Sequence, residues 1–175
     1  MSEGGADRSP ENKMAAKQSA GILLFRFRGH GPEVLLVHPG GPFWAGRDEG
    51  AWSIPKGEFS DNEEPLSAAR REFSEETGVR VEGTFISLGS VRQRSGKIVH
   101  AWALEGDLDA STVKSNTFSL EWPPKSGAYQ EFPEVDRAAW FSPAVARKKI
   151  LAGQIELIDR LEEYLGRDLA LPESS

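Results

Sequence analysis

The segment from Gly57 to Val79 constrains this chain more than any other part of the sequence. It holds seven acidic residues and two arginines, a net charge of −5, whereas the whole chain of 175 residues carries −6. Within it, Pro65 suits the first turn of a helix, and Gly78 suits the left-handed position after the last turn. The sequence therefore predicts a helix over residues 65–77 inside a segment that carries nearly all of the chain's excess negative charge.

Three glutamates share one face of this predicted helix at a cost in helix stability. Glu72, Glu75 and Glu76 are spaced i, i+3 and i+4, and like charges at such spacings destabilise a helix by roughly 0.2–0.5 kcal/mol per pair. They also lie near the helix C-terminus, where the macrodipole disfavours anions. A solvated acidic face with Arg71 paired to Glu75 accounts for them, and so does a site for Mg²⁺ or Mn²⁺, which prefer carboxylate oxygens. The spacing alone leaves both interpretations open.

The same segment, GEFSDNEEPLSAARREFSEETGV, resembles the Nudix box, G-x5-E-x7-R-E-U-x-E-E-x-G-U, where U is a bulky apolar residue. Phe73 and Val79 occupy the apolar positions. The seven fixed positions are all filled, by Gly57, Glu63, Arg71, Glu72, Glu75, Glu76 and Gly78. The resemblance extends over residues 18–141, through SAGILLFR and WSIPKGE before the box and EVDRAAWF after it.

This resemblance implies an α/β fold, the Nudix α/β/α sandwich, with a mixed β-sheet, the Nudix loop-helix-loop and C-terminal helices. It also implies hydrolysis of a nucleoside diphosphate linked to another moiety, with Mg²⁺ or Mn²⁺ required. By the same resemblance, Glu75 and Glu76 are metal ligands together with the backbone carbonyl of Lys56. Glu72 is a ligand or the general base, and Arg71 orients it through a charge-assisted hydrogen bond.

Three further residues receive roles from the resemblance. Gly57 is expected to permit the tight turn that brings the Lys56 carbonyl to the metal. Glu63 is expected to support the first turn of the loop rather than to bind metal. Glu134 lies six residues before Trp140, where several Nudix enzymes carry an additional catalytic or metal-binding acid. The alternative is that Glu134 is an ordinary surface acid. Glu131 and Asp136 are nearby competitors for the catalytic or metal-binding role.

Candidate substrate contacts come from four residues. Lys56 adjoins the predicted metal site and suits a polyphosphate. Arg94 belongs to a stretch of basic residues without acids on a predicted hairpin. The alternative is that this stretch is only a solvated edge of the hairpin and does not bind substrate. Arg26 follows the first apolar strand and either faces the cleft or is simply exposed. Tyr129 is a candidate for stacking on a nucleobase.

Around the box, apolar runs and turn residues predict a sheet closed by helices. The first two strands are expected to form a hairpin, and the Gly-rich loop over residues 39–52 is long enough to suggest a functional role. Ser142 suits a helix N-cap with Gly153 ending that helix, and Gly166 is expected to end the next one. Residues 105–129 are expected to be irregular. We expect strands over residues 19–27, 33–38, 81–93, 97–104 and 137–141, and the last helix over residues 154–165.

Composition narrows the function classes. The chain has no cysteine, which excludes disulfides, thiolate catalysis and cysteine-ligated zinc. The acidic balance argues against a general DNA binder or a protein of anionic membrane surfaces, and no apolar run approaches the roughly 18 residues of a membrane span. We expect a disordered tail over residues 1–17, a single domain over 18–168, a C-terminal tail over 169–175, a cytoplasmic location, and a monomer or homodimer.

The sequence thus predicts a metal-dependent pyrophosphohydrolase that takes a small nucleotide, either a dinucleoside polyphosphate such as diadenosine tetraphosphate (Ap4A) or an NTP. One alternative is an RNA 5′-end pyrophosphohydrolase, although the acidic chain offers no broad basic groove for RNA. Another is a catalytically silent nucleotide-binding sensor, against which the intact box residues count. An isomerase of the isopentenyl-diphosphate type would need a cysteine that is absent. The general base, the number of metal ions and the physiological substrate stay open.

Overall fold

Strand β1 (Gln18–Arg28) is the central strand of the fold. It pairs in parallel with β5 (Ile98–Glu105) along one edge. Along the other edge, its second half pairs antiparallel with β2 (Gly31–Pro39), and its first half pairs antiparallel with β3 (Lys56–Glu58). In the computed structural model, which describes residues 17–170, β4 (Ile86–Arg92) and β8 (Val135–Phe141) complete a six-stranded mixed sheet in the order β4-β5-β1-β2-β8.

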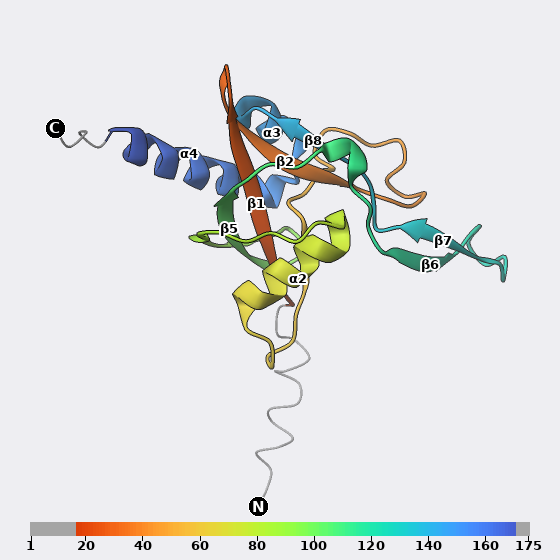
Figure 1. Cartoon of the computed structure of the whole chain (residues 1–175). Helices are drawn as coiled ribbons and strands as arrows, with labels where there is room; N and C mark the ends of the chain where they lie inside the picture. Colours follow the sequence, from red (N-terminus) through yellow and green to blue (C-terminus); the bar gives the residue numbers. More distant parts are fainter. Residues whose placement is uncertain (1–16, 171–175) are drawn as a thin grey trace, which may run out of the picture.

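Helices cover both faces of this sheet (Figure 1). Because side chains alternate along a strand, Ile22 and Leu24 of β1 pack toward α2 (Pro65–Thr77), where Phe73 is fully buried. The neighbouring residues Leu23 and Phe25 pack in the other cluster, with α3 (Pro143–Lys149) and α4 (Ile155–Ala170). The predicted α/β/α sandwich is confirmed, and α2 has the bounds that the sequence predicts.

Two expectations about strands were wrong. Residues 81–85 are not part of β4, because Val81 and Phe85 pack against the cluster under α2 instead of pairing in the sheet. The stretch expected to be irregular, residues 105–129, holds a short 3₁₀ helix, η1 (Ala110–Thr112), and the strand β6 (Thr117–Glu121), and its last residue begins the strand β7 (Tyr129–Pro133). These two strands form a separate two-stranded sheet that projects from the body of the molecule (Figure 1).

Two helix ends also differ from expectation. Helix α3 ends before Ile150, because the backbone there pairs with the β2–β3 loop: Trp52 N–H donates to the Lys149 carbonyl (2.9 Å), and Leu151 N–H donates to the Trp52 carbonyl (2.8 Å). A 3₁₀ turn, η2 (Ala152–Gln154), then leads into α4. Gly166 does not end α4, which continues to Ala170.

The expected tails, residues 1–17 and 169–175, lie almost wholly outside the described residues and stay predictions. None of the helices within residues 17–170 has the length and apolar character needed to cross a membrane.

Candidate active site

Helix α2 holds its glutamates in a fixed orientation because both of its ends are capped. The Glu64 side chain accepts a hydrogen bond from Ser67 N–H at the start, and Pro65 occupies the first turn. Gly78 adopts the left-handed conformation (φ 79°) after the last turn, and its N–H donates to the Ser74 carbonyl. Because the apolar stripe of the helix is buried against the sheet, Glu72 and Glu76 face β3, while Glu75 lies at the outer edge of the carboxylate cluster.

Arg71 connects three carboxylates of the segment. Its Nε and Nη2 both donate to Glu63 at 2.8 Å, which is a bidentate pair. Its Nη1 donates to Glu72 (2.6 Å) and to Glu75 (3.2 Å). These bonds, above all the pair with Glu63, raise the pKa of Arg71. Glu63 thus anchors Arg71 through two hydrogen bonds, and its role in supporting the loop stays a prediction.

Glu72 is held against the backbone of Gly57. Its side chain is 11% exposed, and a Cβ added to Gly57 would lie 1.9 Å from Glu72 Oε1. Burial raises the pKa of Glu72, the contact with Arg71 opposes that rise, and the charges of Glu75 and Glu134 add to it. The glycine is therefore required here for the space it leaves to the carboxylate.

Glu76 lies beside Lys56 and is half-buried. The Lys56 N–H donates to Glu76 Oε1 (3.2 Å). Burial raises the pKa of Glu76 to about 8, and the charges of Glu72 and Glu134 contribute to the same rise. Burial lowers the pKa of the Lys56 ammonium, and the positive charge of Lys97 lowers it further by a smaller amount. Lys97 itself forms an ion pair with Glu58 (3.0 Å), so two lysines border the carboxylates on the β3 side.

The fold brings Glu134 to the same place through three backbone hydrogen bonds. Asn116 N–H donates to the Glu75 carbonyl (3.0 Å), Glu134 N–H donates to the Asn116 carbonyl (2.9 Å), and Gly40 N–H donates to the Glu134 carbonyl (2.9 Å). Burial raises the pKa of Glu134, and the charge of Glu75 adds to the rise. Asn116 and Gly40 are positioning residues that the sequence did not reveal, because they act only through their backbones.

The donor set fits a divalent cation in its chemistry. Glu72 is buried, Glu76 is half-buried and Glu134 is exposed. The charge of Glu134 raises the pKa values of both Glu72 and Glu76, and carboxylate oxygens are what Mg²⁺ and Mn²⁺ prefer. Across residues 17–170, no three histidine or acidic side chains already converge in the geometry of a metal site. Instead, Glu72 and Glu75 turn to Arg71, and Glu76 turns to the Lys56 N–H.

The structure does not bring Arg26 and Arg94 to these carboxylates. Arg26 lies over the Trp140 ring (4.0 Å) and pairs with Glu33 and Asp107, at the end of β1 remote from β3. Arg94 lines a hollow of about 300 Å³ beside η2. Tyr129 is on β7, which leads directly to Glu134, and its side chain is 69% exposed.

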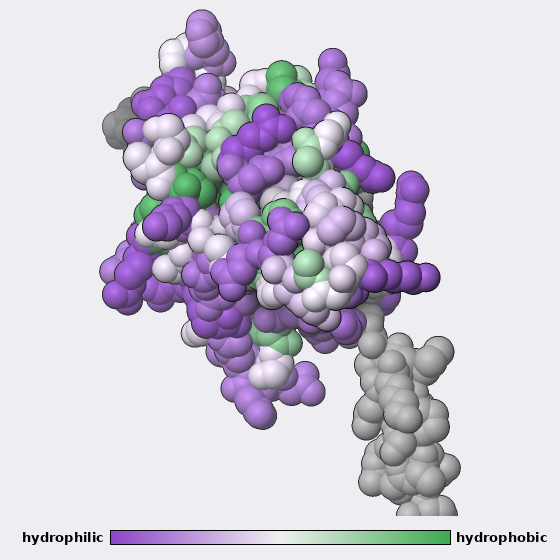
Figure 2. All heavy atoms as spheres, turned by 90° about the vertical axis from the view of Figure 1, so that its right-hand side faces the viewer, coloured by the Kyte–Doolittle hydropathy of each residue, from purple (hydrophilic) through white to green (hydrophobic). Residues whose placement is uncertain are grey.

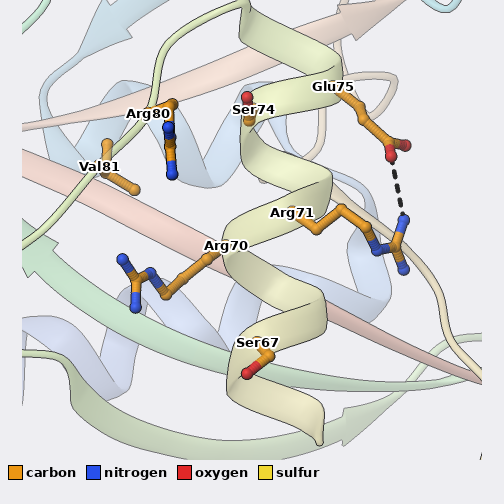
Figure 3. A pocket seen from close by; sticks show the side chains of 7 residues that line it. All are labelled: Ser67, Arg70, Arg71, Ser74, Glu75, Arg80 and Val81. Atoms are coloured by element: carbon orange, nitrogen blue, oxygen red, sulfur yellow. Dashed lines mark hydrogen bonds and ion pairs between the residues drawn. The ribbon is translucent and has the colours of Figure 1, made fainter. Parts of the chain in front are cut away.

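A further hollow, of about 540 Å³, lies on the outer face of α2 (Figure 3). Arg70 and Arg80 point into the same space on one side of the helix, while Arg71 reaches Glu75 on the other (Figure 3). Within the described part of the chain, neither Arg70 nor Arg80 forms an ion pair, although Arg70 lies over the Phe85 ring (5.4 Å). Arg70 and Arg80 therefore make one side of the hollow basic, while Arg71 and Glu75 line its other side.

Comparison with known proteins finds the NUDIX domain over residues 16–161. An RNA pyrophosphohydrolase of Bartonella henselae is 38% identical over 68 residues, which are 37% of this chain and 36% of that protein. An octanoyltransferase of Myxococcus xanthus is 37% identical over 101 residues, 55% of this chain and 24% of that protein. The chain thus spans only about a third of these relatives or less.

Solved structures with the same fold cover nearly the whole chain. An Ap4A hydrolase of C. elegans, in a binary complex, superposes with a TM-score of 0.62 at 22% identity, covering 87% of this chain and 99% of that one. The NUDIX domain of Shewanella oneidensis NrtR, complexed with ADP ribose, superposes with a TM-score of 0.61 at 19% identity, covering 94% and 99%.

Proposed function

Because this chain belongs to the NUDIX domain family, we propose that it is a divalent-metal-dependent pyrophosphohydrolase that cleaves a phosphoanhydride bond of a nucleoside polyphosphate. The observation that carries the proposal is the grouping of Glu72, Glu76 and Glu134, whose pKa values are all raised chiefly by burial. Partial burial and neighbouring negative charge both disfavour the ionised form of a carboxylate, and protons or a cation relieve this. A divalent cation is the partner that their oxygen chemistry favours.

Each residue of the box then has a distinct task. Glu75, Glu76 and the backbone carbonyl of Lys56 would hold the cation, with Glu72 as a further ligand or as the base. When bound, Mg²⁺ or Mn²⁺ supplies charge neutralisation at the phosphate oxygens and stabilises the leaving phosphate. Arg71 fixes the rotamer of Glu72 through its 2.6 Å hydrogen bond. The ammonium groups of Lys56 and Lys97 offer positive charge to the polyphosphate.

The reaction requires one carboxylate to accept a proton from water. The water oxygen forms a bond to phosphorus, the bridging P–O bond breaks, and the proton of the water passes to Glu72 or Glu134. A raised pKa makes both glutamates stronger bases than a free carboxylate, which suits general-base catalysis near neutral pH. Both stay candidates for this role.

A dinucleoside polyphosphate or an NTP is the substrate class that we favour. The strand SAGILLFR and the WSIPKGE segment look closest to the Nudix branches that act on these compounds. The similarity to the fold of a C. elegans Ap4A hydrolase agrees with this choice, although a shared fold does not fix a substrate.

A second candidate is 5′-triphosphorylated RNA. Two relatives are named RNA pyrophosphohydrolases, from Bartonella henselae and from Novosphingobium aromaticivorans, the latter 46% identical over 54 residues. Arg70 and Arg80, on the outer face of α2, offer unpaired guanidinium groups within the described residues that suit backbone phosphates. In that case, cleavage of RNA would weaken with added salt and on replacing Arg70 and Arg80 by glutamine.

A panel of substrates separates these candidates. Purified protein with Mg²⁺ is incubated with NTPs, Ap4A, ADP-ribose and 5′-triphosphorylated RNA in ¹⁸O-labelled water, and the products are identified by mass. We expect release of a mononucleotide from Ap4A or an NTP, with one ¹⁸O atom in a phosphate product. Micromolar binding without turnover of any compound would instead favour a nucleotide sensor.

A further inference from the structure

Gln154 is a polar residue that lies in the interior of the protein. The surface seen in Figure 2 is largely hydrophilic, as expected where polar side chains meet water. Gln154, the last residue of η2, has instead no exposed surface (0%). Burying a carboxamide costs free energy unless its donors and acceptor are paired, whereas an apolar side chain of similar size fills the space without that cost. The hydrogen bonds of this side chain therefore indicate its role.

Both ends of the Gln154 carboxamide are bonded, and its oxygen holds a backbone group. Gln154 Oε1 accepts a hydrogen bond from the Ile54 N–H (3.0 Å), a residue 100 positions earlier in the chain. Gln154 Nε2 donates to Gln93 Oε1 (2.8 Å) and to Ser53 Oγ (3.1 Å). A satisfied polar network in the interior fixes one arrangement of its members. The start of α4 is thereby tied to the segment that leads into β3.

Ile54 lies where this segment changes its strand partner. Ser53 pairs with β2, and Lys56 pairs with β1. Between these two pairings, the Ile54 N–H bonds to the side chain of Gln154 in place of a strand. Only Pro55 separates Ile54 from Lys56, and its ring fixes φ, so the backbone there has little freedom. A displacement of Ile54 would therefore be passed on to Lys56.

Lys56 is the residue at which this segment meets the carboxylates. Its N–H donates to Glu76 Oε1 (3.2 Å), and the function proposed above assigns its carbonyl to the cation. Because the carbonyl belongs to the backbone, its position depends on what holds the chain on either side of it. The pairing of β3 with β1 holds one side, and the bond from Ile54 to Gln154 holds the other.

We propose that Gln154 is a positioning residue for the cation site, which acts through Ile54 on the Lys56 carbonyl. This proposal rests on the pyrophosphohydrolase function proposed above and adds to its site a residue from the C-terminal part of the chain. Replacing residues that orient a ligand without touching the metal commonly costs about 10–100-fold in metal affinity. The loss of the Gln154 carboxamide therefore weakens cation binding, beyond any effect on stability.

Gln154→Met tests this role, because methionine is unbranched, fills a similar space and offers the Ile54 N–H no strong acceptor. Mn²⁺ binding without nucleotide, followed by the EPR signal of free Mn²⁺, should show a Kd about tenfold higher than in the wild type. In the metal-free protein, hydrogen exchange of the Lys56 amide should be about tenfold faster, because its contact with Glu76 is no longer held in place. Gln154→Asn draws the amide oxygen back from Ile54, and we expect the same two changes if the methionine variant does not fold.

Three control variants separate positioning from a general loss of stability. Gln93→Met removes one partner of Gln154 and leaves the bond to Ile54 in place. Gln130→Met makes the same change at an exposed residue of β7. Ile158→Val removes a methylene from the core on α4, outside the network. All three should keep the Kd for Mn²⁺ within about twofold of the wild-type value.

The outcomes distinguish this role from the proposed function. An unchanged Kd for Mn²⁺ or unchanged exchange of the Lys56 amide in Gln154→Met overturns the positioning role. An equal rise of the Kd in Gln93→Met or Ile158→Val also overturns it, because the bond to Ile54 is intact in both. If the wild type binds Mn²⁺ but hydrolyses nothing, and the Kd still rises in Gln154→Met, the proposed function fails and the positioning role stands. A wild type that binds no Mn²⁺ overturns both.

Discussion

Arg71 explains how a helix tolerates carboxylates that should repel one another. Its guanidinium bonds to Glu63, Glu72 and Glu75, so the expected pairing with Glu75 is present as one of several contacts. Glu76 does not bond to Arg71; it is half-buried and accepts a hydrogen bond from the Lys56 N–H. At the scale of single residues, the acidic face is therefore divided into a part that Arg71 neutralises and a part left for another cation.

Gly57→Ala tests whether Glu72 must pack against a bare backbone. A Cβ at position 57 would lie 1.9 Å from Glu72 Oε1, so the carboxylate has to move. We expect kcat to fall by about tenfold or more, because small displacements of catalytic groups are costly, and Mg²⁺ affinity measured by calorimetry to weaken.

Gly29→Ala is the control, since a Cβ there meets no atom within 4 Å. It should leave both quantities unchanged. Wild-type turnover in Gly57→Ala would contradict the placement of Glu72 in the site.

The box residues could be placed from the sequence because they lie within one short segment. For Glu134, the resemblance to the Nudix family implied a place near them, with Glu131 and Asp136 as competitors. Arg26 and Arg94 could not be placed, because their surroundings depend on contacts remote in the sequence. Arg26, for example, pairs with Asp107, 81 residues away.

At the scale of elements, α2 was predicted to the residue because its signals are local. Pro65 and Gly78 mark its two ends, and no other segment competes for its backbone. The end of α3 depends instead on pairing with Trp52, about a hundred residues earlier. The β6–β7 hairpin escaped prediction because its strands are short and mostly exposed: β6 (TFSLE) alternates apolar and polar residues over only five positions, and β7 (YQEFP) does not alternate.

Gly78 and Gly166, both expected from the sequence to end helices, should respond in opposite ways to alanine. Gly78 is left-handed at the end of α2, and a Cβ there would lie 2.9 Å from the Lys114 carbonyl oxygen. Gly78→Ala should therefore destabilise the protein by about 1 kcal/mol or more. Gly166 is inside α4 with open space around it, so Gly166→Ala should stabilise by about 0.5–1 kcal/mol.

Urea unfolding of the two variants measures both changes. Destabilisation by Gly166→Ala would contradict the continuation of α4 through that residue, and a neutral Gly78→Ala would contradict the left-handed cap of α2.

At the scale of the whole molecule, the net charge of −6 is concentrated in the Gly57–Val79 segment and is not spread evenly over the surface. Two or three divalent cations bound there would bring about +4 to +6, close to the charge of the Gly57–Val79 segment. The loaded site could then accept a polyanion that the bare chain would repel. The charge argues against a general DNA binder, but it does not argue against phosphate substrates.

The central claim is that the carboxylates beside α2 hold a cation for phosphoanhydride hydrolysis. Glu76→Gln and Glu82→Gln remove the same charge, but Glu82 is exposed on the loop after α2 and outside the site. With Mg²⁺ and Ap4A or ATP as substrate, the account predicts that Glu76→Gln lowers kcat about 100-fold or more, while Glu82→Gln keeps the wild-type rate. Equal rates for Glu76→Gln and the wild type would contradict the account.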